Sequence, residues 1–146
     1  MTRTDQKKAF CYELPVVWSD LDPLGHVSNL RFPVYLESAR AVYYLGLLGE
    51  KDPLKIDFII ARLEIDFRSA AFFDDMLQVW IKPGKIGNTS FELEDLVTEK
   101  RSGRVVAEAR SVQVCLDYRT RTKKKVPATL ARTMREEALC KFPDAR

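Results

Sequence analysis

Hydrophobic residues recur at helical spacing over one long stretch of the chain. Between Asn29 and Leu48 they cover a wide arc of a helical wheel, at Val34, Leu36, Ala39, Val42, Tyr43, Leu45 and Leu48. Ser28 or Asn29 can cap the start of this segment, and Pro33 is tolerated because first-turn amides mostly lack partners. Gly49 suits its end. The pattern predicts one long, largely apolar helix.

From Phe58 onward the hydrophobic period changes from helical spacing to alternation. One predicted face holds Ile59, Ala61, Leu63, Ile65 and Phe67, whereas Arg62, Glu64, Asp66 and Arg68 point the other way. Such alternation predicts a strand with one buried face. Further strands are predicted at Tyr12–Trp18, Met76–Lys82, Thr89–Thr98 and Arg104–Tyr118, with turns at Pro83-Gly84, Gly87-Asn88 and Ser102-Gly103. A closing helix is predicted at about residues 128–140.

Successive hairpins imply an antiparallel sheet, which must curl around the apolar helix in order to bury it. The expected fold is therefore α+β, with an antiparallel sheet of about five strands wrapped around one long central helix. A chain of 146 residues with 46% hydrophobic content suits a single domain, residues 1–146, with its core at about 11–127. Because an open sheet leaves edges to protect, a homodimer is the smallest assembly expected, and a homotetramer stays open.

Charge is nearly balanced, since 24 Lys and Arg against 21 Asp and Glu give a formal charge of +3. The basic residues are nevertheless uneven, and five of them gather in one stretch: Arg119, Arg121, Lys123, Lys124 and Lys125. On charge alone this run is a solvated turn. The more specific alternative is a binding site for an anionic ligand. Nucleic acid is such a ligand in principle. No nucleic-acid partner is expected.

The cysteines, Cys11, Cys115 and Cys140, are odd in number, far apart and without the paired spacing of a zinc or redox motif. They indicate a reducing compartment and predict no metal site. Met1–Phe10 is polar and lacks a secretory core, and no apolar run approaches the ~20 residues of a membrane helix. The sequence thus predicts a cytoplasmic protein that does not associate with membranes.

The segment Trp18–Asn29, which joins the first strand to the helix, has the spacing Asp-x-Asp-x-x-Gly-His-Val-x-Asn. Three other segments accompany it: Glu37-Ser38-Ala39-Arg40, Asp66-Phe67-Arg68-Ser69-Ala70 and Gly87-Asn88-Thr89-Ser90-Phe91. Together they resemble the 4-hydroxybenzoyl-CoA thioesterase-like branch of the hotdog-fold superfamily, over nearly the whole chain. The resemblance implies a hotdog fold and an acyl-CoA thioesterase that hydrolyses an acyl or aroyl thioester, with acyl-CoA or an acyl carrier protein as substrate and no cofactor. Ser28 departs from the pattern, because many relatives carry a second asparagine there.

Thioester hydrolysis needs a group that activates water or attacks the carbonyl, and a donor that stabilises the oxyanion. Asp22 can act as general base or as nucleophile, and relatives of this type place their catalytic carboxylate at this second aspartate of the motif. The start of the helix can supply the donors, through unpaired amides near Val27 to Leu30 and the positive end of the helix dipole. Gly25 lets the backbone approach closely.

Three other residues of this segment allow a structural reading beside a chemical one. His26, the only histidine, can polarise the carbonyl or orient water, or can have a structural role. Asn29 can cap the helix and still lend its amide to the oxyanion site. Asp20 is expected only to hydrogen-bond nearby backbone amides.

The resemblance also implies where coenzyme A binds. It places Asn88, Thr89 and Ser90 near the pantetheine entrance. Lys85 and the run from Arg119 to Lys125, Lys123 included, become candidates for the CoA phosphates, because flexible basic side chains bind phosphate well. These residues can come from a neighbouring subunit.

Two other functions remain compatible with the sequence. A hotdog-fold hydratase or dehydratase needs a histidine and an acid, which His26 and Glu37 could imitate. A non-catalytic acyl-CoA-binding module is possible for any fold of this kind. A Ser-His-Asp hydrolase and a nucleotide hydrolase are not supported, because the Gly-x-Ser-x-Gly elbow and the Walker spacing are both absent.

Overall fold

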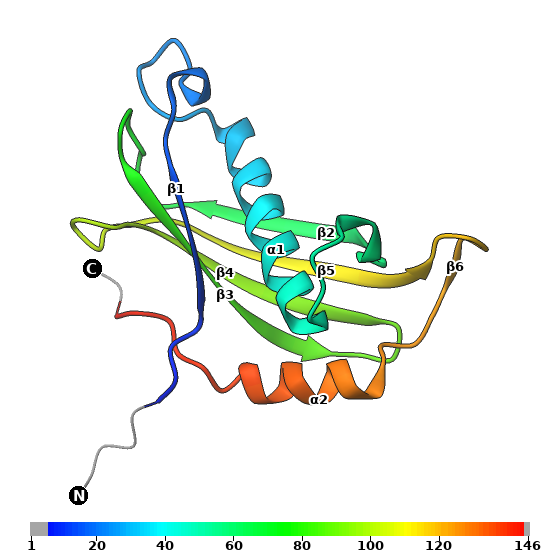
Figure 1. The fold of residues 1–146 in the computed structure, drawn as a ribbon. Coiled ribbons are helices and arrows are strands. Elements are labelled where there is room, and N and C mark those ends of the chain that lie inside the picture. Colours follow the sequence, from blue (N-terminus) through cyan, green and yellow to red (C-terminus); the bar gives the residue numbers. More distant parts are fainter. Residues whose placement is uncertain (1–5, 145–146) are drawn as a thin grey trace, which may run out of the picture.

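The protein folds as a curled antiparallel sheet around one long helix, which is the expected hotdog arrangement (Figure 1). The computed structural model describes residues 6–144. Five strands follow the order β1-β3-β4-β5-β2, and the short β6 pairs antiparallel with the end of β5. The strands are β1 (Phe10–Pro15), β2 (Phe58–Phe67), β3 (Met76–Ile86), β4 (Ser90–Glu99), β5 (Val105–Asp117) and β6 (Thr122–Lys123); the helices are α1 (Phe32–Leu48) and α2 (Ala128–Glu137).

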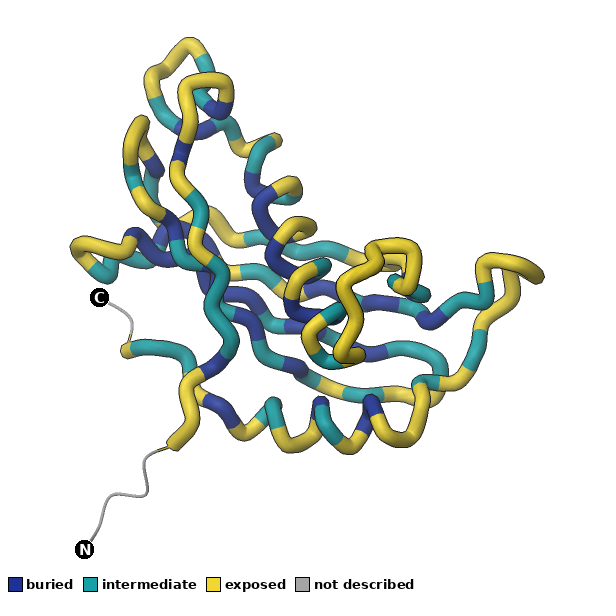
Figure 2. Tube along the Cα trace, in the orientation of Figure 1, coloured by how far each residue is buried: buried dark blue, intermediate teal, exposed yellow. Residues whose placement is uncertain are grey.

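Helix α1 begins three residues later than the sequence pattern predicts, because a 3-10 turn at Asn29–Arg31 precedes it. Ser28 caps this turn, since its Oγ accepts a hydrogen bond from the Leu30 amide at 3.2 Å. Gly49 ends the helix in the left-handed region with φ 67°, which glycine adopts without strain. Between these limits α1 turns its buried face to the sheet (Figure 2).

The core lies between α1 and the concave face of the sheet. Tyr44 of α1 packs edge-on against Phe58 and stacks on Phe91, with ring centroids 4.7 and 5.9 Å away. Leu130 and Met134 bring α2 into the same core. Among residues 6–144, no helix has the length and hydrophobicity required to cross a membrane.

Strand β2 corrects the predicted alternation. Phe58 pairs with Cys115 on the concave face, but the register shifts between Ile60 and Arg62, which leaves Ala61 as the extra residue of a β-bulge. Leu63, Ile65 and Phe67 therefore face the helix as predicted, whereas Ile59 is on the opposite face. A bulge changes the phase of the alternation by one residue, so a regular period drawn across it assigns the residues before it to the wrong face.

Strand β3 continues through the predicted turn at Pro83-Gly84 and ends only at Ile86. Pro83 pairs with Leu93 of β4, and the register becomes irregular between Pro83 and Ile86. On the other side, β1 reaches only as far as Ile81. Pro83 thus lies where β3 has no neighbour on that side, and a missing amide is tolerated at such an edge.

One charged pair is buried between α1 and the sheet. Nη1 of Arg40 lies 3.7 Å from Oδ2 of Asp95 on β4, and both side chains are almost fully buried. Within the described chain, neither carboxylate oxygen of Asp95 has a hydrogen-bond partner. Burial raises the pKa of Asp95 to about 7, and the Arg40 guanidinium offsets only part of this effect.

Candidate active site

The loop between β1 and α1, residues 21–28, is called here the active-site loop. It closes on itself as a tight turn: the Asp22 amide donates to the His26 carbonyl, and the Gly25 amide to the Asp22 carbonyl, both at 3.0 Å. Gly25 has φ 85°, a conformation that disfavours any residue with a Cβ atom. The turn brings Asp22 and His26 together at its base. In Figure 1 the loop lies above the start of α1.

The Asp22 carboxylate is oriented through one oxygen only. Its Oδ1 accepts a hydrogen bond from the Leu24 amide at 2.9 Å, while its Oδ2 lies 3.9 Å from Nδ1 of His26. The Asp22 side chain is 25% exposed, so that water and substrate can reach it. The His26 Nδ1 atom is also 3.4 Å from the Val27 carbonyl oxygen. This arrangement presents an accessible carboxylate oxygen beside an imidazole.

Asp20, in contrast, has the contacts of a structural residue. It is buried, accepts the Val17 amide at 3.0 Å through Oδ2 and binds Nε of Arg31 at 2.9 Å through Oδ1. Burial by itself would raise the pKa of Asp20, but the Val17 amide and the Arg31 guanidinium stabilise the charged form and lower it overall. Asp20 therefore ties the end of β1 to the turn that starts α1.

Most of the amides expected to be free as oxyanion donors are already bonded. The Val27 amide donates to the Ala71 carbonyl at 2.8 Å, the Ser28 amide to the Asp20 carbonyl at 3.0 Å, and the Leu30 amide to the Ser28 side chain. Only the Asn29 amide of this group has no hydrogen-bond partner within residues 6–144. The expectation of several free amides is corrected to this one, beside the positive end of α1.

A cavity of about 210 Å³ opens beside the loop. His26 and Asn29 line it, whereas Asp22 and Gly25 lie just outside its lining. The opposite wall comes from the end of β2 and the segment after it: Phe67, Arg68, Ser69, Ala70 and Ala71. The sequence offered a signal for this wall, since Asp66 to Ala70 is part of the family resemblance, but that resemblance assigned it no role.

The residues expected to bind CoA also lie together, but elsewhere. The Val126 amide donates to the Asn88 carbonyl at 2.9 Å, and the Cys115 amide to the Thr89 carbonyl at 2.8 Å. These bonds bring the β3–β4 turn, with Lys85, Asn88, Thr89 and Ser90, beside the β5–β6 hairpin, with Arg119 and Lys123. We call these six residues the basic end of the sheet.

The basic end lies at the opposite end of α1 from the active-site loop. Asp57 joins the last turns of α1 to the basic end. Its carboxylate accepts the Tyr44 hydroxyl at 2.5 Å and pairs with Lys124, the residue after Lys123. With 17 residues and a rise of about 1.5 Å each, α1 is roughly 26 Å long. Within one protomer, the structure therefore does not bring Asp22 and the basic residues together.

The curled antiparallel sheet around one long helix defines the class of protein, a hotdog fold. Residues 16–134 match the family described as the Thioesterase-like superfamily, and the chain belongs to that family.

Named relatives agree with this assignment. The chain is 30% identical over 105 residues to the long-chain acyl-CoA thioesterase FadM of Escherichia coli, a match covering 68% of this chain and 77% of FadM. It is also 30% identical over 127 residues to the 1,4-dihydroxy-2-naphthoyl-CoA hydrolase of Nostoc punctiforme, covering 82% of each. A thioesterase of Thermus thermophilus, solved with coenzyme A and zinc, superposes with a TM-score of 0.78 at 28% identity, covering 90% of this chain and 96% of that one.

Proposed function

We propose that this protein hydrolyses acyl-CoA thioesters to free acid and coenzyme A, with Asp22 as the reacting carboxylate. The observation that carries the proposal is the environment of the Asp22 carboxylate. The Leu24 amide fixes its Oδ1, while its Oδ2 remains accessible beside His26. The CoA thioesters named for both curated relatives support the substrate class. Their acyl groups differ, one a long chain and the other a naphthoyl group, so they support a CoA thioester more than any one acyl group.

The chemistry follows from these positions. As general base, Asp22 takes a proton from water while the water oxygen attacks the thioester carbonyl carbon. The Asn29 amide and the positive end of α1 stabilise the resulting oxyanion. The carbon–sulfur bond then breaks, and the CoA thiolate leaves and takes up the proton. As nucleophile, Asp22 would attack the thioester carbonyl carbon and displace the CoA thiolate, and water would hydrolyse the resulting mixed anhydride in a second step.

The site is complete only in a homodimer. Strand β2 is an edge of the sheet, and its Ile59, Ile60 and Phe67 are 42%, 39% and 46% exposed. Pairing with a second β2 would cover this edge. In an antiparallel pair, the Phe58 end of one strand meets the Phe67 end of the other.

This pairing brings the basic residues of one protomer to the active-site loop of the other. The Phe58 end of β2 adjoins the basic end of the sheet, because Phe58 pairs with Cys115 next to the β5–β6 hairpin. The Phe67 end lines the cavity beside the active-site loop. Lys85, Arg119 and Lys123 of one protomer would thus bind the CoA phosphates of a substrate held at the other protomer's Asp22.

The position of Glu37 argues against the alternative function, a hydratase or dehydratase. This residue lines a different cavity, with Arg40 and Phe58, whereas His26 lines the cavity beside the active-site loop. Within a protomer, the histidine and the acid that such a reaction would pair do not share one pocket. Hydrolysis requires no such pair, because Asp22 alone would be the reacting carboxylate.

The test measures free thiol released from short, medium, long-chain and aromatic acyl-CoAs, and from an acyl carrier protein thioester. Wild type is compared with Asp22→Asn and with the matched control Asp52→Asn, an exposed aspartate beyond the end of α1 whose Oδ1 likewise accepts an amide two residues further on, that of Leu54 at 2.9 Å. We expect Asp22→Asn to lower kcat by about 100-fold or more and the control to retain activity. Equal activity of the two variants would remove Asp22 from the mechanism, and 2-enoyl-CoA hydration exceeding thiol release would favour the hydratase.

A further inference from the structure

We propose that Arg104 positions the active-site loop for catalysis through the chain segment that follows β2. This inference rests on the proposed role of Asp22. The segment in question, residues 68–75, is called here the support segment. It forms one wall of the cavity beside the active-site loop and contacts that loop directly. Arg104 itself neither lines the cavity nor contacts Asp22, so it would act only through its neighbours.

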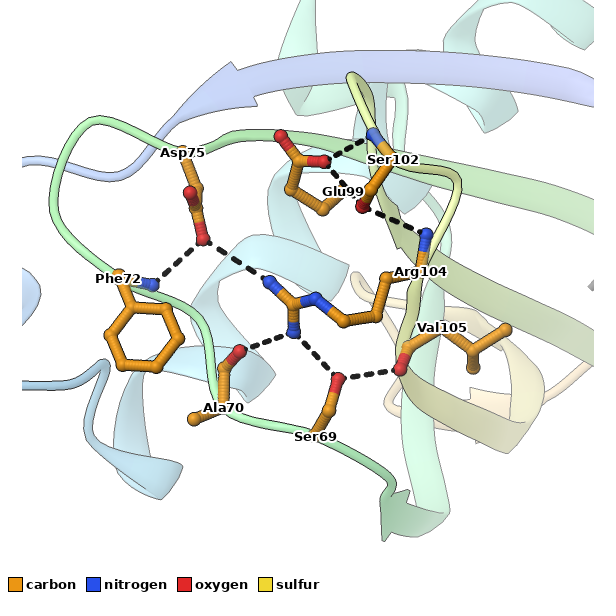
Figure 3. Close-up of polar contacts among 8 residues, drawn as sticks. All are labelled: Ser69, Ala70, Phe72, Asp75, Glu99, Ser102, Arg104 and Val105. Carbon is orange, nitrogen blue, oxygen red and sulfur yellow. Dashed lines mark hydrogen bonds and ion pairs between the residues drawn. The ribbon is translucent and has the colours of Figure 1, made fainter. Parts of the chain in front are cut away.

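Arg104 grips the support segment at three points (Figure 3). Its Nη1 donates to the Ser69 hydroxyl at 2.7 Å and to the Ala70 carbonyl at 2.5 Å. Its Nη2 lies 3.6 Å from Oδ2 of Asp75, the carboxylate oxygen that also accepts the Phe72 amide at 2.9 Å. The guanidinium thus connects the two ends of the support segment and fixes the distance between Ser69 and Asp75.

The support segment passes this constraint to the active-site loop. The carbonyl of Ala70 belongs to the same peptide group as the amide of Ala71, so the bond from Arg104 fixes the orientation of that peptide plane. The next carbonyl, that of Ala71, accepts the Val27 amide at 2.8 Å. Val27 follows His26, whose carbonyl accepts the Asp22 amide. A short, continuous chain of bonds therefore runs from the guanidinium to the turn that carries Asp22.

Arg104 is itself held firmly at its base (Figure 3). The Ser102 hydroxyl accepts the Arg104 amide at 3.2 Å, and Glu99 accepts both the amide and the hydroxyl of Ser102 at 2.7 Å. The hydrogen bonds from Ser102 lower the pKa of Glu99, which keeps this acceptor ionised. The β4–β5 turn is consequently a rigid base for the guanidinium, which a flexible surface arginine would lack.

The chemistry of the contact requires arginine. Three acceptors surround one planar group, and a lysine ammonium on its flexible stem cannot reproduce this fork. A small displacement of a reacting group can lower kcat about 100-fold, whereas binding determined by distant contacts is unaffected. Because Arg104 is not among the residues that would bind the CoA phosphates, loss of the guanidinium should act on kcat and leave KM for acyl-CoA within about twofold.

The experiment compares Arg104→Gln and Arg104→Lys with Arg110→Gln, a control arginine on the outer face of β5 that pairs with Glu64. Steady-state kinetics are measured for each in the wild-type and the Asp22→Asn backgrounds, together with thermal unfolding. We expect kcat to fall about 10- to 100-fold in Arg104→Gln and less in Arg104→Lys, with the control unchanged. In the Asp22→Asn background, Arg104→Gln should cost no further activity, because a positioning residue has nothing left to position.

Equal losses of kcat in both backgrounds would overturn the proposal, since they would indicate general destabilisation. An unchanged kcat in Arg104→Gln would overturn it as well. If Arg104→Gln does not fold, Ser69→Ala removes one acceptor alone and should show a smaller kcat loss, again absent in the Asp22→Asn background. A fully active Asp22→Asn enzyme would instead refute the proposed function, so the two failures are distinguishable.

Discussion

Nδ1 of His26 lies 3.9 Å from the free carboxylate oxygen of Asp22 and 3.4 Å from the carbonyl oxygen of Val27. The Nδ1 side of the ring therefore faces the loop itself, and its function there would be to orient Asp22. We expect His26→Asn, which can place an amide nitrogen near the Nδ1 position, to retain most of the wild-type kcat. His26→Gln, which extends toward the Nε2 position, should lose about tenfold. Thiol-release kinetics of both variants test this, and the reverse ranking would mean that Nε2 acts on the substrate.

Activity should depend on residues from two protomers. A heterodimer that combines an Asp22→Asn chain with an Arg119→Gln/Lys123→Gln chain keeps one site in which both the carboxylate and the basic end are intact. We therefore expect it to recover kcat/KM relative to either parent homodimer. Differently tagged chains, co-expressed and purified through both tags, allow this measurement at low acyl-CoA concentration and low salt, where phosphate contacts contribute most.

The matched control for this experiment places all three substitutions in one chain and pairs it with a wild-type chain. If each site combines residues of both protomers, this heterodimer has no intact site and should be nearly inactive. If each site belongs to a single protomer, this heterodimer keeps one intact site on its wild-type chain and is active. The first heterodimer then has no intact site and is nearly inactive. The pair of mixtures thus decides between the two arrangements.

The buried Arg40–Asp95 pair predicts a pH dependence of stability. Asp95 has a pKa of about 7 in the folded protein against a reference value of 3.8. Between these values the folded protein keeps a proton that the unfolded chain has released, so stability falls as pH rises, by up to about 1.4 kcal/mol per pH unit. Asp95→Asn should lose this slope. Urea unfolding of both proteins at intervals from pH 5 to pH 8 measures it, and parallel curves would show that Asp95 is already ionised at pH 5.

Two adjacent tyrosines of α1 should respond differently to loss of their hydroxyl groups. Tyr44 donates to Asp57 at 2.5 Å, so Tyr44→Phe should lower the free energy of unfolding by about 1 to 2 kcal/mol. The Tyr43 hydroxyl is buried without a hydrogen-bond partner in the described part of the chain, so Tyr43→Phe should be neutral or stabilising. Chemical denaturation of the two variants compares them directly. A larger loss for Tyr43→Phe would mean that a water molecule satisfies its hydroxyl.

Much of the fold could be predicted from the sequence because periodicity depends on local spacing. The long helix and the order of the hairpins follow from residues close together in the chain, and both are confirmed. The errors arose where a residue's environment is set by a distant strand. The sequence predicts a turn at Pro83, and the proline is tolerated in β3 only because β1 stops pairing at Ile81. The sequence likewise predicts that Ile59 is buried, because the alternation alone does not indicate the bulge at Ala61.

The candidate site divides in the same way. Asp22, Gly25 and His26 lie within one turn, so a local motif could bring them together. The bond between Val27 and Ala71 and the grip of Arg104 on Ser69 join residues far apart in the chain, and no pattern in the sequence indicates such partners. The availability of each amide for the oxyanion likewise depends on these partners and could not be predicted locally.

The bulge in β2 also determines where this strand can change length. Removing one residue from a regular strand would turn every side chain on one side of the deletion to the opposite face. Ala61 is the exception, because it has no partner on β5 and its loss would leave Phe58 and Ile60 on the concave face, in phase with Leu63 and Ile65. In the course of evolution a one-residue deletion could therefore become fixed at Ala61 while the faces of the edge strand, and the dimer interface they would form, were inherited unchanged.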